Sequence, residues 1–167
     1  MLHKVKIAGL AMDEVSGTPI IILQTEDKEA RTVPIWIGLL EATAIASTLR
    51  DITFDRPMTH DLFKNFSEYL NYHVSKVEIC DIRDNTYYAR IYFFSPEQSF
   101  DMDARPSDAI AIALRFNAEI YVDTKVFEKS QTAMDEKAEA LDQSKEGQKW
   151  AEYLENMAPD DFGKYKM

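Results

Sequence analysis

The stretch DARPSDAIAIAL, residues 103–114, joins a charged turn to a segment without polar side chains. Pro106 fixes its own φ and disfavours helical backbone at Arg105, so a helix is expected to begin here. Ser107 can cap its first turn, and Asp108 lies where the helix dipole favours an anion. The remaining residues are apolar all round, which is typical of a buried helix. The stretch therefore predicts a polar cluster fixed to the end of a buried helix, a rigid support that suits a functional site.

A second stretch, RPMTHD at residues 56–61, has the same construction. It places an arginine, a proline and a hydroxyl residue before an acid at a predicted helix start, and it adds His60. The flanking residues differ, so the two stretches are not a repeat. If both belong to one site, the two helix starts should converge and bring His60 or Asp61 near Arg105 or Asp108.

The length and composition predict one domain with an ordinary hydrophobic core. The chain has 167 residues, of which 46% are hydrophobic, and its net charge is −10. This acidity argues against a broad basic face for nucleic acid but leaves room for a local cationic site. Cys80 is the only cysteine, which excludes an intramolecular disulfide. No apolar run reaches the length of a signal sequence or a membrane span, so a cytoplasmic protein is expected.

The hydrophobic pattern predicts an α+β fold with a mixed, largely antiparallel sheet and three main helices. Pro34 lacks an N–H for the sheet, so its strand should lie at an edge or carry a bulge. The aromatic residues of the second helix are expected in the core, and Cys80 is expected to be buried in a strand. The strands are predicted at residues 5–10, 19–24, 31–37, 74–79, 86–94, 100–104 and 120–122, and the helices at 39–49, 59–71 and 107–116.

The predicted domain covers residues 1–129, and residues 130–167 form a polar linker followed by a helical tail. In this tail Trp150, Tyr153, Leu154 and Met157 have the spacing of a short amphipathic helix. Such a segment suits docking on the domain or on another subunit, whereas residues 130–146 are equally well explained as a solvated tail.

Several common functional motifs are absent from the sequence. It has no glycine-rich phosphate loop, no nucleophile elbow, no metalloprotease histidine pair and no zinc finger. The aromatic strand at 86–94 could stack bases, but alternation favours burial of about half of it. The remaining candidates are charged or polar residues at helix starts and in the turns before them: Glu41, Arg56, His60, Asp61, Asp103, Arg105, Ser107 and Asp108.

These residue types suit the hydrolysis of a phosphodiester. Carboxylates can hold Mg²⁺ or Mn²⁺, a histidine can transfer a proton, and the fork of an arginine can bind a phosphate. The alternative is structural. In that interpretation Arg105 and Arg56 pair with Asp61, Asp103 or Asp108 and join helix ends together.

The same residues resemble the bifunctional nuclease family. The resemblance is carried by PIWIG at 34–38 with Glu41-Ala42, by RPMTHDL at 56–62, by TYYA at 86–89 and by DARPSDAIA at 103–111. It spans roughly residues 5–128, and it departs at Asp51 and Asn85, where the family usually has glycine. The resemblance implies a mixed α+β fold, a homo-oligomer (a dimer) and hydrolysis of both RNA and DNA.

The leading hypothesis is a metal-assisted nuclease that acts on RNA and DNA, without a membrane partner. Its catalytic residues are predicted to be His60, Asp61 and Asp108. Its substrate-binding residues are predicted to be Arg56, Arg105 and Ser107, and its ligands for a divalent metal Glu41, Asp103 and Asp108. The rival hypothesis is a non-catalytic oligomeric module that binds a small anion or a protein partner and keeps the carboxylates as structural pairs.

Overall fold

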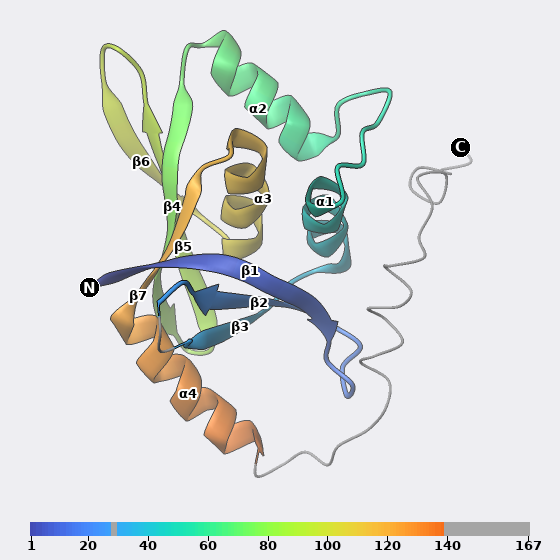
Figure 1. Ribbon diagram of the computed structural model, residues 1–167, viewed down its shortest axis with the longest axis vertical. Helices are drawn as coiled ribbons and strands as arrows, with labels where there is room; N and C mark the ends of the chain where they lie inside the picture. Colours follow the sequence, from blue (N-terminus) through green and yellow to red (C-terminus); the bar gives the residue numbers. More distant parts are fainter. Residues whose placement is uncertain (28–29, 139–167) are drawn as a thin grey trace.

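The structure, a computed structural model, describes residues 1–27 and 30–138. Within these ranges seven strands and four helices form an α+β fold (Figure 1). The strands are β1 (Leu2–Met12), β2 (Pro19–Thr25), β3 (Thr32–Trp36), β4 (His73–Arg83), β5 (Thr86–Phe94), β6 (Ser99–Ala104) and β7 (Glu119–Asp123). The helices are α1 (Leu39–Leu49), α2 (Thr59–Tyr69), α3 (Pro106–Phe116) and α4 (Thr124–Ala138).

The strands form one mixed sheet in the order β3-β2-β1-β7-β4-β5-β6. Two antiparallel meanders, β1–β2–β3 and β4–β5–β6, meet at β7, which is antiparallel to β1 and parallel to β4. The mixed, largely antiparallel sheet is therefore confirmed. Pro34 lies in the edge strand β3, where the missing N–H interrupts no further ladder, as predicted.

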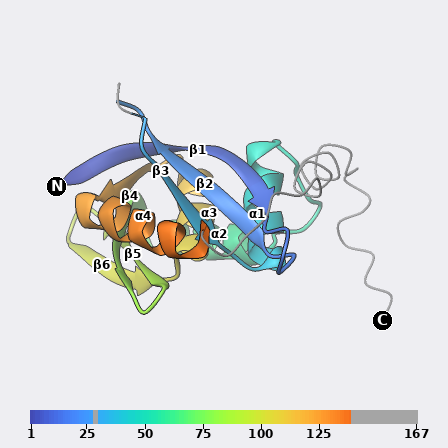
Figure 2. The same cartoon turned by 90° about the horizontal axis from the view of Figure 1, so that it is seen from below.

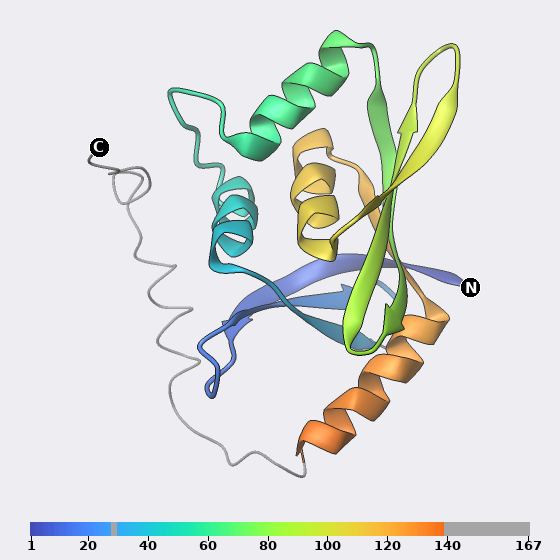
Figure 3. The ribbon, with the colours of Figure 1, turned by 180° about the vertical axis from the view of Figure 1, so that it is seen from behind.

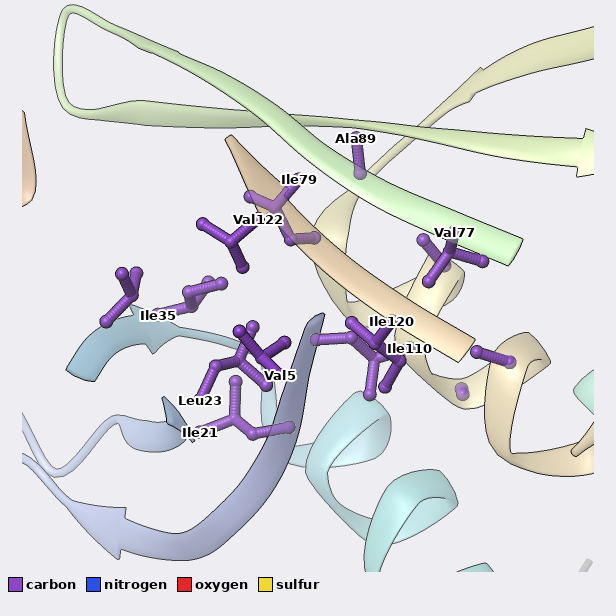
Figure 4. Packing of buried hydrophobic residues seen from close by; sticks show 14 of the residues in the cluster. Val5, Ile21, Leu23, Ile35, Val77, Ile79, Ala89, Ile110, Ile120 and Val122 are labelled. Carbon is purple, nitrogen blue, oxygen red and sulfur yellow. The ribbon is translucent and has the colours of Figure 1, made fainter. Parts of the chain in front are cut away.

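Helix α3 is the buried helix that the sequence predicts. Its residues Ala109 to Ala113 are all buried, and Ile110 has no exposed surface. It packs against β4, β5 and β7 on one side and against α1 and α2 on the other (Figures 1 and 3). Ile110 lies beside Ile120 of β7 in the shared core (Figure 4). Burial of such a side chain stabilises the fold by about 1.5–3 kcal/mol, so the start of α3 rests on a well-anchored element.

The sheet curls so that β3 approaches the β4–β5 hairpin. The hydroxyl of Tyr87 in β5 donates a hydrogen bond of 2.7 Å to the carbonyl oxygen of Pro34 in β3 and lies 3.2 Å from the hydroxyl of Ser130. Ser130 belongs to α4, which packs on β3, β4 and β7 at the end of the molecule opposite α2 (Figures 1 and 2). Helix α4 thus continues across the predicted domain limit at residue 129. The rest of the predicted tail, including Trp150 to Met157, lies outside the described residues.

The prediction that α2 buries its aromatic residues is wrong for most of them. Phe63 packs on Phe93 of β5, with ring centroids 6.1 Å apart. Four other apolar side chains of this segment are exposed, because α2 crosses the end of α3 and only a narrow face of it meets the protein (Figure 1). These side chains are Leu62, Phe66, Tyr69 and Leu70.

The predicted serine cap of α3 is also wrong. Arg105 is the N-cap, with extended backbone (φ −69°, ψ 146°), and no side chain caps the helix. Pro106 takes the first helical position, as proline often does, so Ser107 already lies inside the first turn. Likewise Met58, and not Thr59, is the N-cap of α2. Within the part of the chain that the structure describes, no helix is long and apolar enough to cross a membrane.

A change at the C-terminus of α3 should show how the helix ends. Asn117 has φ 53° and ψ 37°, which is a left-handed backbone conformation. Residues with a Cβ adopt it at a cost in free energy, and this cost is smaller for asparagine and aspartate. We expect Asn117→Ala to lower the free energy of unfolding by about 1 kcal/mol in urea titrations, since alanine pays that cost. Asn117→Gly is the control and should not be destabilising, because glycine adopts this conformation freely. Equal destabilisation by both variants would contradict the prediction.

Candidate functional site

The starts of α1, α2 and α3 converge on one cluster of charged side chains. Glu41 lies in the first turn of α1, His60 and Asp61 in that of α2, and Asp108 in that of α3. Helix α1 and helix α2 both pack against α3, which brings these turns together (Figures 1 and 3). The predicted convergence of the two Arg-Pro helix starts is therefore confirmed.

A chain of ion pairs runs through the cluster. His60 Nε2 lies 3.0 Å from Asp108 Oδ1, and Arg105 Nε donates to Asp108 Oδ2 at 2.7 Å. The same guanidinium contacts Glu41 through Nη1, with 2.8 Å between Nη1 and Oε1. The two oxygens of Asp108 are thus divided between a histidine and an arginine. One carboxylate thereby fixes the relative positions of His60 and Arg105.

The surroundings of Asp108 favour its ionised form. Partial burial opposes ionisation, but hydrogen bonds from Arg105 and His60 outweigh it and hold the pKa of Asp108 below its ordinary value. The hydrogen bond to Asp108 and the further one to Glu41 raise the pKa of the Arg105 guanidinium. Because the carboxylate accepts, the His60 ring donates through Nε2. Nδ1, which makes no hydrogen bond to any described residue, is then left as an acceptor.

Asp61 serves a different purpose from Asp108. Its Oδ1 accepts a 2.6 Å hydrogen bond from Arg115 Nε, and its Oδ2 accepts one of 3.0 Å from the N–H of Met58. Burial raises the pKa of Asp61, but the hydrogen bonds from Arg115 and Met58 lower it by more. Arg115 also donates to the carbonyl oxygens of Ala44 and Ala111 at 3.1 and 3.0 Å. This arginine therefore connects α1, α2 and α3 directly behind the cluster.

A pocket of about 380 Å³ between α1, the α1–α2 loop and the start of α3 is lined by Glu41, His60 and Asp108 of the cluster and by Arg105. We call it the helix pocket. His60 is mostly buried, with 15% of its side chain exposed, whereas 65% of the Arg105 side chain is exposed. The walls combine apolar side chains such as Leu40 and Met58 with the charged groups Glu41, Arg105 and Asp108. A pocket with an apolar wall and a few convergent polar groups is the usual form of a small-ligand or substrate site.

The structure does not bring together the three predicted metal ligands. Asp103 is exposed on β6, opposite Arg90 of β5, on the face of the sheet turned away from the buried Ala89 and Ile91. Arg105 occupies the space between Glu41 and Asp108. Over residues 1–27 and 30–138, no group of three His, Cys, Asp or Glu side chains is placed to hold a metal. The residues in this arrangement therefore do not fit a divalent ion.

The other predicted residues are distributed around the site. Arg56 is exposed in the α1–α2 loop and does not line the helix pocket. Ser107 is buried beside Arg105 and lines a neighbouring pocket. Arg115 was not predicted, because it follows the apolar face of α3 at the far end of the helix and its sequence position carries no motif. The burial of this charged side chain, of which only 6% is exposed, is visible only in the structure.

A change at Gly38 should isolate the Glu41–Arg105 contact. Gly38 is the N-cap of α1 with φ −72°, which any residue can adopt, but a Cβ there would lie 2.1 Å from Glu41 Oε2. We therefore expect Gly38→Ala to push the Glu41 side chain off Arg105 and to lower the free energy of unfolding by up to about 1 kcal/mol, the scale of a pair whose arginine is solvent-exposed. Urea titrations measure the effect. It should vanish in a Glu41→Ala background, and a loss of equal size there would contradict the assignment.

The fold and the site define an α+β domain with a charged pocket at converging helix starts. Residues 21–135 match the bifunctional nuclease domain, and the chain belongs to this family. It is 33% identical to the uncharacterized protein Rv1829 of Mycobacterium tuberculosis over 165 residues, which cover 96% of this chain and 98% of that protein. It is 30% identical to bifunctional nuclease 1 of Oryza sativa subsp. indica over 109 residues, which cover 64% of this chain and 33% of the rice protein.

A similar match connects the chain to a second plant. It is 25% identical to bifunctional nuclease 1 of Arabidopsis thaliana over 117 residues, 68% of this chain and 36% of that protein. The region shared with the plant proteins is thus about a third of their length. The match to the bifunctional nuclease domain, residues 21–135, includes α1, α2 and α3, the helices that form the helix pocket.

Proposed function

We propose that this protein hydrolyses phosphodiester bonds of RNA and DNA in the helix pocket. The observation that carries the proposal is the placement of His60 and Arg105 on the two oxygens of Asp108, at the edge of one pocket. A proton acceptor and a guanidinium held by one carboxylate are what the attack of water on a phosphodiester needs. Membership of the bifunctional nuclease family supports the same class of reaction.

The chemistry assigned to each residue follows from its contacts. Asp108 holds the His60 ring so that Nδ1 can take a proton from water as the water oxygen bonds to phosphorus. The bond from phosphorus to the leaving oxygen breaks, and the imidazolium returns the proton to that oxygen. Arg105, whose Nη2 makes no hydrogen bond to any described residue, donates to the phosphate oxygens as negative charge develops on them. Asp61 is assigned to holding α2 through Arg115, and not to the reaction.

A second candidate function is supported by the same ion pairs. Glu41, Arg105 and Asp108 satisfy one another, as expected of a structural cluster in a non-catalytic module that binds a small anion or a protein partner. The net charge of −10 also suits this candidate better than tight binding of long polyanions. Both candidates place the ligand at Arg105, so they differ in whether a bond is broken.

Cleavage assays separate the two candidates. The full chain is incubated with end-labelled single-stranded RNA and DNA of equal sequence, in EDTA, in Mg²⁺ and in Mn²⁺. The proposal expects shortened products from both nucleic acids. Intact substrates under all three conditions, with folded protein, would overturn it in favour of the binding module. The three conditions also measure the metal dependence, which stays a prediction, as do the dimer and the cytoplasmic location.

A further inference from the structure

Arg105 lies between two pockets. Besides the helix pocket, it lines a second pocket of about 470 Å³ between the end of β3, the β4–β5 hairpin turn and the start of α3. We call it the sheet pocket. Its wall includes Trp36 of β3, Asn85 and Thr86 of the hairpin, and Ser107 of α3. A ligand in the helix pocket that contacts Arg105 is therefore next to a further open space on the other side of the same side chain.

Ser107 offers an unused hydroxyl to the sheet pocket. The residue is 5% exposed, and its Oγ makes no hydrogen bond to any of residues 1–27 and 30–138. The same described part contains no completely enclosed side-chain oxygen or nitrogen that lacks a partner, so this hydroxyl reaches the pocket surface. Because the rest of the residue is buried, a partner can reach this hydroxyl only from the pocket. Its position therefore points to a ligand that accepts a hydrogen bond.

The backbone at the same place supplies further donors. The first hydrogen bond inside α3 runs from the N–H of Ala109 to the carbonyl oxygen of Arg105, at 3.0 Å. The N–H groups of Ser107 and Asp108 precede it, and no side chain caps them. Helix α3 has 11 residues, so its dipole adds positive potential at this end. Four donors here lack an acceptor among the described residues: the two amides, the Ser107 hydroxyl and Nη2 of Arg105, whose Nε and Nη1 already donate to Asp108 and Glu41. Phosphate oxygens match such a set of open donors.

We propose that the sheet pocket is a second phosphate subsite, which holds the phosphate next to the one being cleaved. This inference rests on the proposed function, because the helix pocket is taken as the place of the cleaved phosphate. The two phosphates would lie on either side of Arg105. The neighbouring phosphate can be an internal diester of a longer strand or a terminal monoester, and both present the same oxygens. The enzyme should then prefer substrates with at least two phosphates.

Short substrates of defined phosphate number test the subsite. They are a dinucleotide with a single phosphodiester, the same dinucleotide with a phosphate at its 5′ or 3′ end, and a trinucleotide without terminal phosphates. We expect the second phosphate to raise kcat/KM of the full chain by about tenfold or more, since hydrogen bonds to a charged group are strong. A gain with the trinucleotide alone identifies an internal phosphate, and a gain with a phosphorylated dinucleotide identifies a terminal one.

Ser107→Ala should remove most of this gain, so that it lowers kcat/KM on the substrates with two phosphates by much more than kcat/KM on the plain dinucleotide. The change deletes no hydrogen bond among the described residues and favours helix, so folding should be preserved. Ser67→Ala is the control, because Ser67 is a buried helical serine whose hydroxyl donates to the carbonyl oxygen of Tyr72. That variant should keep the full gain. A gain that survives Ser107→Ala, or no gain in the unchanged protein, would overturn the subsite.

Titration with inorganic phosphate gives a readout that needs no cleavage. Phosphate should shift the backbone amide NMR signals of Ser107 and Asp108 in the full chain, and less so in Ser107→Ala. If these signals shift but no substrate is cleaved, phosphate binding in the sheet pocket stands, whereas the proposed nuclease function fails and with it the role of this pocket beside a cleaved phosphate. If substrates are cleaved while the signals do not move and the second phosphate brings no gain, the subsite fails and the nuclease function stands. If the NMR signals shift but the second phosphate does not raise kcat/KM of a protein that cleaves its substrates, the sheet pocket is not a subsite for the substrate.

Discussion

His60→Ala is expected to lower kcat for both RNA and DNA by about 10²–10⁴-fold, the usual contribution of a positioned acid–base group. The side chain is mostly buried and lines the helix pocket, and in the proposed mechanism its Nδ1 takes the proton from the attacking water. Initial rates on labelled oligonucleotides measure the effect. KM should change less than kcat, since the imidazole acts on the reacting atoms and contributes little to binding the strand.

His73→Ala is the matched control for this change. His73 is exposed on β4, its ring lies against Phe94 with centroids 5.8 Å apart, and it lines neither the helix pocket nor the sheet pocket. This variant should cleave at the unchanged rate. Thermal melts of both variants show whether either loses its fold. Full activity in a folded His60→Ala protein would remove the histidine from the mechanism.

Asp108→Asn should have an effect of similar size on the rate. The asparagine amide keeps the shape of the carboxylate but has an NH2 donor in place of one oxygen. It therefore cannot accept hydrogen bonds from both His60 and Arg105, as Asp108 does. Residues that act as one unit are not additive. The double variant with His60→Ala should therefore be little slower than either single variant, and a multiplied loss would show that the two residues act separately.

Local chemistry made α3 and the candidate pair predictable. Pro106 fixes where the helix begins, and the uninterrupted apolar run after Asp108 requires burial on all sides. Both Arg-Pro stretches begin helices, so their polar residues lie at helix starts. The contact between His60 and Asp108 then arises because α2 packs against α3. The chemistry was thus fixed locally, while the meeting of the two stretches depended on the fold.

The errors concern long-range packing, which local patterns do not contain. The spacing of Phe66 and Tyr69 on α2 is the same whether the helix lies on a sheet or crosses the end of another helix, so exposure was not predictable. Asp103 precedes the site by two residues, yet the alternation of β6 turns it to the other face of the sheet. In both cases the direction of a side chain depends on how its helix or strand packs in the fold, and the local sequence does not contain that information.

Arg115→Met is expected to lower the free energy of unfolding by about 2–4 kcal/mol, although Arg115 is not one of the residues assigned to the reaction. Its side chain is 6% exposed and donates to Asp61, Ala44 and Ala111. Methionine keeps the length and apolar contacts of the arginine but removes every donor, which leaves the Asp61 carboxylate and two carbonyl oxygens without this partner. Urea titration at neutral pH measures the loss. Arg105→Met is the matched control and should cost less than about 1 kcal/mol, because that side chain is 65% exposed.

The pH dependence of this loss follows from Asp61. Its pKa is lowered in the folded protein, so the stabilisation by the pair is complete above the ordinary carboxyl pKa and is lost as the pH falls through the lowered value. The difference between the unchanged protein and Arg115→Met should therefore be largest near neutral pH and should shrink in acid. Asp61→Asn removes the titrating group and should make the effect of Arg115→Met smaller and nearly independent of pH. A loss below about 1 kcal/mol at neutral pH, or one that grows in acid, would show that Arg115 does not hold α2 in place through this pair.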